Sequence, residues 1–154
     1  VEEQAGLFGR KLERVDVPEF EISRVEAAFD QIELLGFPLC SPFELLAASP
    51  PPDCILAVQM KDHIARIVRM AGYLVTVKRT RTSGGKTMFF GTFIDSEGQW
   101  VDTVHFPPVA HRYPFRGPGI YVIRGKIVEE FDFLSLEVYD MERQPYMEDP
   151  RYAL

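Results

Sequence analysis

The sequence has little cysteine, since Cys40 and Cys54 are the only two in 154 residues. Their spacing fits no metal-binding motif, and we expect reduced thiols rather than one disulfide. The chain also has no run of about eighteen uncharged apolar residues, so no membrane-spanning helix is expected. Its first residues contain no basic segment followed by an apolar run, which predicts no signal peptide and a cytoplasmic location. The absence of an initiator methionine indicates a piece of a longer chain.

Catalytic motifs are missing as well. The aspartates are scattered, and none forms the paired arrangement that two-metal phosphoryl transfer requires. There is no Gly-rich phosphate loop of the Walker type. His63, His105 and His111 lie too far apart in the sequence to suggest a metal site. We therefore expect a protein that is not an enzyme and that uses no metal or cofactor.

Acidic residues outnumber basic ones, and the net charge of −6 argues at first against a nucleic-acid partner. Residues 61–86, however, contain seven basic residues and one acidic residue, a net charge of +6, which leaves −12 for the rest. Because exposed charges are screened beyond about 8–10 Å, such a basic stripe can still attract phosphate. A solvated strand face explains the charge pattern equally well.

Helix signals are confined to the first part of the chain. Residues 1–22 are polar and aperiodic, and they read as a linker. Ser23 and Glu26 form a capping-box pattern, which predicts that a helix begins there. Apolar residues then recur at helical spacing as far as Gly36, a natural stop.

Two shorter helices are predicted after this one. Ser41 and Glu44 form a second capping-box pattern with proline at the first helical position, and they predict a short helix through about Ala47 or Ala48. A further short helix is predicted near residues 58–63. Residues 23–62 are thus interpreted as a helical lead-in segment.

The rest of the chain has the patterns of β-strands, with Gly72 expected at a bend or bulge in the first of them. A short helix or turn is predicted at residues 109–115, between the third strand and the fourth. Five strands with a helical insertion at this point are typical of the oligonucleotide-binding (OB) barrel, and a five-stranded SH3-like barrel is the nearest alternative. We predict a mainly β protein, with an OB barrel over residues 63–143 and an extended tail over residues 144–154. The strands are predicted at residues 67–82, 87–95, 99–106, 120–130 and 134–141.

Several blocks of the sequence match a known family in order and spacing. They are residues 70–78, 80–88, 95–99 with 105–107, and 123–127, preceded by residues 33–39 with 41–42. These blocks resemble the OB domain of the bacterial replicative DNA polymerase III alpha subunit and the segment before it. The resemblance covers about residues 30–143. It implies a parent DNA-directed DNA polymerase, whose remaining chain and fellow replisome subunits would be partners of this piece.

A short peptide near the start resembles the sliding-clamp-binding peptide of such polymerases. Gln4 is followed three residues later by the apolar pair Leu7 and Phe8. In the resemblance, Leu7 and Phe8 fill an apolar pocket of the clamp, and Gln4 supplies hydrogen bonds at its rim. A stray apolar pair is the alternative.

The expected DNA-binding residues lie around the loops of the predicted barrel. Four basic residues surround the first inter-strand loop, which OB folds use to grip oligonucleotides. Single-strand binders combine such a cationic groove with aromatic faces for the bases. Trp100 and His105 have structural interpretations as well, as core residues, and Phe131 and Phe133 could instead be half-buried against each other. The candidates are Lys78, Arg79, Arg81, Lys86, Phe89, Trp100, His105, Phe131 and Phe133.

Two functions of different classes remain open. The first is a single-stranded-DNA-binding module, tolerant of sequence, that positions the template near a polymerase. The second is an OB module that docks protein subunits of the replisome and binds little DNA itself. The negative net charge of the chain favours protein docking, and the cluster of basic residues around the first loop favours DNA binding. An RNA-binding OB domain of an aminoacyl-tRNA synthetase is a more distant alternative.

Overall fold

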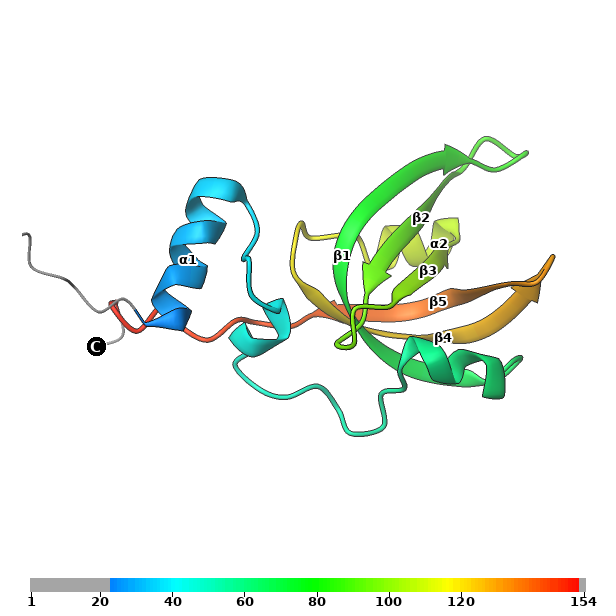
Figure 1. Ribbon diagram of the computed structural model, residues 1–154. Coiled ribbons are helices and arrows are strands. Elements are labelled where there is room, and N and C mark those ends of the chain that lie inside the picture. The colour runs from blue at the N-terminus through cyan, green and yellow to red at the C-terminus, as the bar shows by residue number, and fades with distance from the viewer. Residues whose placement is uncertain (1–22, 153–154) are drawn as a thin grey trace, which may run out of the picture.

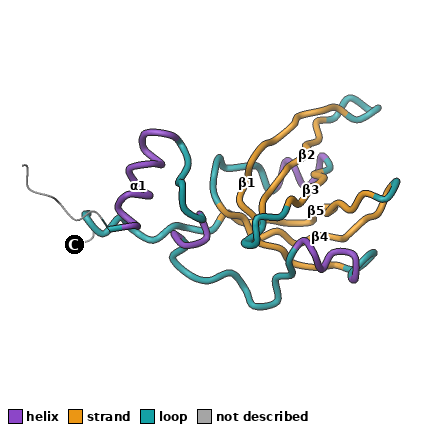
Figure 2. Tube along the Cα trace, in the orientation of Figure 1, coloured by secondary structure: helices purple, strands orange, loops and turns teal. Residues whose placement is uncertain are grey.

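The computed structural model describes residues 23–152, in which five strands close into a barrel in the order β1-β2-β3-β5-β4 (Figures 1 and 2). Neighbouring strands are antiparallel except β3 and β5, which pair in parallel. This arrangement, with a helix between β3 and β4, is the OB fold, as predicted. The elements are α1 (Arg24–Leu35), β1 (Ile67–Arg81), β2 (Thr87–Ile94), β3 (Trp100–His105), α2 (Pro107–Arg112), β4 (Ile120–Glu130) and β5 (Phe133–Arg143).

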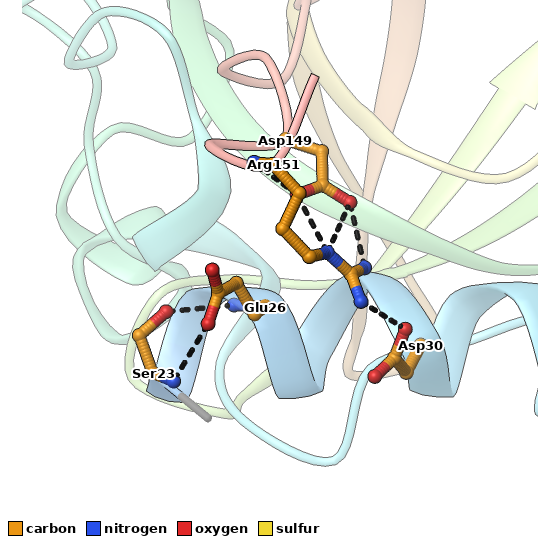
Figure 3. A network of polar contacts seen from close by, with 5 residues as sticks. All are labelled: Ser23, Glu26, Asp30, Asp149 and Arg151. Carbon is orange, nitrogen blue, oxygen red and sulfur yellow. Dashed lines mark hydrogen bonds and ion pairs between the residues drawn. The ribbon is translucent and has the colours of Figure 1, made fainter. Parts of the chain in front are cut away.

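The capping box predicted for α1 is confirmed. The Ser23 hydroxyl oxygen accepts a hydrogen bond from the Glu26 backbone N–H at 3.2 Å, and the Glu26 carboxylate accepts one from the Ser23 N–H at 2.9 Å (Figure 3). The helix ends at Gly36, whose φ of 83° places it in the left-handed region that glycine tolerates best. None of the helices in residues 23–152 is long and apolar enough to cross a membrane.

The second capping box does not form, so that prediction is wrong. Residues Pro42–Leu45 make a single 3₁₀ turn, and the Ser41 side chain makes no capping hydrogen bond. The Glu44 carboxylate accepts a hydrogen bond from Arg24 at 3.1 Å instead. The turn stops before Ala47 because Leu46 is extended and pairs with Tyr146. The third short helix is confirmed, as a 3₁₀ helix at Ala57–Asp62.

The segment after β5 runs back along the lead-in and joins α1 to the barrel (Figure 1). The Met147 N–H donates to the Leu45 carbonyl at 2.7 Å. Further along, the Arg151 guanidinium pairs with Asp149 at 2.7 Å and with Asp30 of α1 at 2.8 Å (Figure 3). Asp149 and Asp30 hold the pKa of Arg151 above its ordinary value through these hydrogen bonds.

Gly72 was predicted to lie at a bend or bulge in β1, and that prediction is wrong. A register shift does occur in β1, but it lies between Leu74 and Thr76 rather than at Gly72. Gly72 serves close packing, because a Cβ there would lie 2.8 Å from the Cβ of Phe93, a fully buried residue. Outside the barrel, Cys40 and Cys54 are both free, as expected.

Candidate nucleic-acid interface

The register of β2 decides which aromatic side chains reach the outer face of the barrel. Gly91 and Phe93 are buried, so the residues alternating with them point outward. Phe90 is therefore on the outer face, where it is 42% exposed. Phe89 lies on the opposite face, with its ring 5.8 Å from that of Phe115. The prediction that Phe89 occupies the open face is thus wrong by one residue.

Phe90 lies in a hollow of about 230 Å³ on this outer face. Strands β2 and β3 line one side of it, together with Phe106, which is also 42% exposed and follows β3 directly. Strands β4 and β5 supply the opposite wall, which includes Glu130 and Glu137. Lys78 of β1 is paired with Phe90 across the strands, so its side chain lies beside that ring on the same face. We call this site the outer hollow.

The β4–β5 turn displays two aromatic rings at the end of this wall. Phe131 is 93% exposed and Phe133 is 77% exposed, so they are not half-buried against each other. Phe131 and Asp132 both have positive φ, 51° and 64°, which is the backbone of a tight two-residue hairpin turn. A bulky residue rarely adopts this conformation, and the turn places the Phe131 ring in solvent.

Trp100 is on the outer face as well, 61% exposed at the first position of β3. It alternates with the buried Val101 and shares its face with Asp102 and Val104. Its interpretation as a core residue is therefore wrong, and its exposure is what base stacking requires.

His105 is fully buried, so the prediction that it stacks on a base is wrong. Its Nε2 lies 2.8 Å from the Thr103 hydroxyl oxygen, and its ring centroid lies 4.6 Å from that of Phe115. Its Nδ1 has no hydrogen-bond partner among the described residues. Burial lowers the pKa of His105 to about 4, because the interior disfavours the charged ring. This matches the structural interpretation of the residue.

The four predicted cations are all exposed, but the register divides them between the two faces of the β1–β2 hairpin. Lys78 is on the outer face. Arg79 is paired with Phe89 and Arg81 with Thr87, so both lie on the opposite face. Lys86 lies in the loop of the hairpin. None of the four forms an ion pair with another residue in the range 23–152.

Charge is distributed unevenly between the two hairpins, which both project away from α1 (Figure 1). The β1–β2 hairpin carries cations on both faces, whereas the β4–β5 hairpin carries Glu129, Glu130 and Asp132, all exposed. A polyanion that crosses the outer face is therefore attracted by the β1–β2 hairpin and repelled by the β4–β5 hairpin. Of the two hairpins, the β1–β2 hairpin is thus the one whose charge favours phosphate.

Phe90 and Phe106 belong to this outer face but were not predicted. If Gly91 had been known to point inward, alternation along β2 would have placed Phe90 on the outer face and Phe89 on the inner face. Phe106 ends the strand predicted at residues 99–106, and its alternation with Trp100 and Val104 is the signal that could have placed it on the same face as Trp100. The predicted clamp-binding residues Gln4, Leu7 and Phe8 lie outside the described residues.

No protein-family model matches the chain, and no curated protein matches it. Among solved structures, it is similar to a lipoprotein from Klebsiella pneumoniae named for nucleic-acid binding, with 15% identity and a TM-score of 0.42 over 56% of this chain and 76% of that one. It is also similar to the N-terminal domain of the PriB protein from Thermoanaerobacter tencongensis, with 11% identity and a TM-score of 0.39 over 51% of this chain and 96% of that one. Neither protein is a polymerase subunit by name, and with TM-scores below 0.5 these likenesses decide nothing about function.

Proposed function

We propose that the barrel binds single-stranded DNA across its outer face and along the β1–β2 hairpin, without catalysing a reaction. The observation that carries this proposal is the pair of exposed rings, Phe90 and Phe106, in a hollow with the Lys78 side chain beside it. Bases stack on such rings, while a neighbouring cation contacts the backbone. A duplex keeps its bases stacked on each other, so it cannot use these rings.

The arrangement favours binding that tolerates any sequence. Stacking needs only the flat face that every base has, and phosphate contacts carry no sequence information. Phe131, Phe133 and Trp100 extend the aromatic surface beyond the outer hollow. They offer further positions along the strand, which suits a module that must pass every template sequence.

The salt dependence of binding tests this proposal. If Lys78, Arg79, Arg81 and Lys86 neutralise about four phosphates, log affinity for labelled oligothymidine should fall against log salt with a slope of about −3. Replacing Arg79 and Arg81 together by alanine should reduce the slope to about −1.5, because two phosphate contacts are lost. Fluorescence anisotropy at several salt concentrations measures both slopes.

The control replaces Lys61 and Arg66, two exposed cations before β1, and should leave the slope at the wild-type value. All these substitutions lie on the surface, where the cost in stability is usually under about 0.5 kcal/mol. A wild-type slope near zero, or equal affinity for duplex DNA, would contradict the proposal.

The finer proposal is that this module belongs to a replicative DNA polymerase alpha subunit in the cytoplasm and positions the template strand near its catalytic part. The blocks of sequence similarity between residues 30 and 143 support it. In this proposal, Gln4, Leu7 and Phe8 bind the sliding clamp, and the rest of the polymerase chain and other replisome subunits are further partners.

Replacing Leu7 and Phe8 by alanine tests the clamp proposal. The double change should abolish binding to the sliding clamp, because two apolar side chains supply most of the contact in such a short peptide. Surface plasmon resonance against immobilised clamp measures this loss. The melting temperature and the affinity for oligothymidine should not change. A drop in stability of several kcal/mol would instead mean that both side chains pack in this chain's own core.

A docking function with little DNA binding is the second candidate, and one surface favours it. Leu34 and Leu35 at the end of α1 are exposed, as are Phe37 and Leu39 just after it. Apolar side chains gathered in this way often mark protein contacts. This surface lies on the lead-in segment rather than on the barrel, so docking there and DNA binding on the outer face are compatible.

A further inference from the structure

A second hollow, of about 500 Å³, lies on the other face of the β1–β2 hairpin, between the hairpin and α2. Lys86, Thr87 and Phe89 line it from the hairpin, and Pro107 and His111 line it from the other side. We call it the hairpin–helix hollow. Its lining contains no aspartate or glutamate, in contrast to the outer hollow, where Glu130 and Glu137 contribute.

Cations and hydrogen-bond donors surround this hollow. Lys86 and His111 are both exposed and lie in its lining. Arg79 and Arg81 share its face of the hairpin, because they are paired with Phe89 and Thr87 across the strands. The Arg79 guanidinium lies 3.5 Å from the Thr87 hydroxyl oxygen, which brings its charge toward the rim. In a chain of net charge −6, such a concentration of donors without a carboxylate suits a phosphate group.

The two hollows meet at an open edge of the sheet. The pairing of β2 with β3 ends at Phe89 and His105, so the first residues of β2 have no partner on that side. Met88 and Phe106 line the outer hollow, whereas the residues next to them in sequence, Thr87 and Pro107, line the hairpin–helix hollow. A single strand of nucleic acid can therefore pass from one hollow to the other across this edge.

We propose that the hairpin–helix hollow binds a phosphodiester group of the same single strand whose bases stack in the outer hollow. The inference rests on the proposed function and assigns a path to the strand. The Lys86 ammonium supplies charge and donors to the phosphate oxygens, and a ring N–H of His111 donates from the opposite side. The exposed part of Phe89 contacts the adjoining sugar or base.

A length series of oligothymidine tests the path. Only strands long enough to cross the edge can use both hollows, so Lys86→Ala with His111→Ala should weaken the binding of long strands about tenfold. The salt slope for these strands should become shallower by about 0.7 for the lost phosphate contact. The shortest strands that still bind should have wild-type affinity. A matched control, Lys61→Ala with His63→Ala, should change neither quantity at any length.

Each other outcome has a definite meaning. An equal loss at every length would show that Lys86 and His111 act only by general attraction, and no loss at any length would show that the hollow is unused; either result overturns the inference but leaves the proposed function standing. If millimolar inorganic phosphate binds in the hollow of the wild-type protein, and the variants do not change the binding of oligothymidine, the hollow is a site for free anions instead. Failure of the wild-type protein to bind any strand would overturn the proposed function itself.

Discussion

Replacing Phe90 and Phe106 together by alanine is expected to weaken the binding of oligothymidine by at least about 30-fold. Stacking of a base on an aromatic ring is worth about 1–3 kcal/mol, and two rings are lost. Each 1.4 kcal/mol corresponds to about a tenfold change in affinity. The salt slope should remain at the wild-type value, because no cation is removed. Fluorescence anisotropy with labelled oligothymidine measures the affinity and the slope.

The matched control is Phe37→Ala, which removes a phenylalanine of similar exposure next to α1. This variant should bind with wild-type affinity. Because Phe90 and Phe106 are each only partly buried, the double variant should still fold, and its melting curve checks this point. If it folds and binds as tightly as the wild-type protein, bases do not stack in the outer hollow.

The stability of the barrel is expected to fall as the pH is lowered from about 6.5 to about 4, in large part because of His105. The pKa of His105 is about 4 in the folded protein and near its ordinary value of about 6.5 in the unfolded chain. Between these values the unfolded chain binds the additional proton, so the free energy of unfolding decreases as the pH falls. The contribution of the neutral ring is fully present above about pH 6.5 and is lost progressively toward pH 4. Its size is roughly 3 kcal/mol, at about 1.4 kcal/mol for each unit of pKa difference.

Urea denaturation at a series of pH values measures this dependence, and His105→Phe isolates the part due to the ring. Phenylalanine keeps the aromatic contact with Phe115 but cannot take up a proton. Thr103 retains a partner in the variant, because its hydroxyl also donates to the Gly91 carbonyl at 3.0 Å. The variant should therefore lose less stability on acidification than the wild-type protein. Identical pH profiles would show that other groups cause the acid sensitivity.

The elements of this fold could be predicted from the sequence because their signals are local. The capping box joins Ser23 to Glu26, three residues away, and the stop depends on the backbone of Gly36 itself. The strands were predicted to within three residues at each end, since turn residues separate them. The second capping box failed for a reason that is not local: Glu44 is bound by Arg24, which lies 20 positions away.

The faces of the site could not be predicted, because they depend on register. Alternation along β1 places Lys78 and Arg79 on opposite faces, but the shift between Leu74 and Thr76 changes which residues of β1 share a face with the residues before it, so the face of each cation could not be assigned in advance. Closure of the barrel then buries His105 and leaves Trp100 in solvent at the two ends of one short strand. The sequence could thus indicate the loops that matter, but only the fold assigns individual side chains to each hollow.

Chemical-shift mapping by NMR tests the central claim most directly, because it reports where on the molecule a strand binds. On titration of ¹⁵N-labelled protein with oligothymidine, the largest saturable changes should fall on β2, β3 and the two hairpins, with α1 unchanged. The amides of Phe90 and Phe106 should be among those that move. Changes confined to α1 and the residues after it, or no saturable change at all, would contradict the assignment of a DNA-binding face to this barrel.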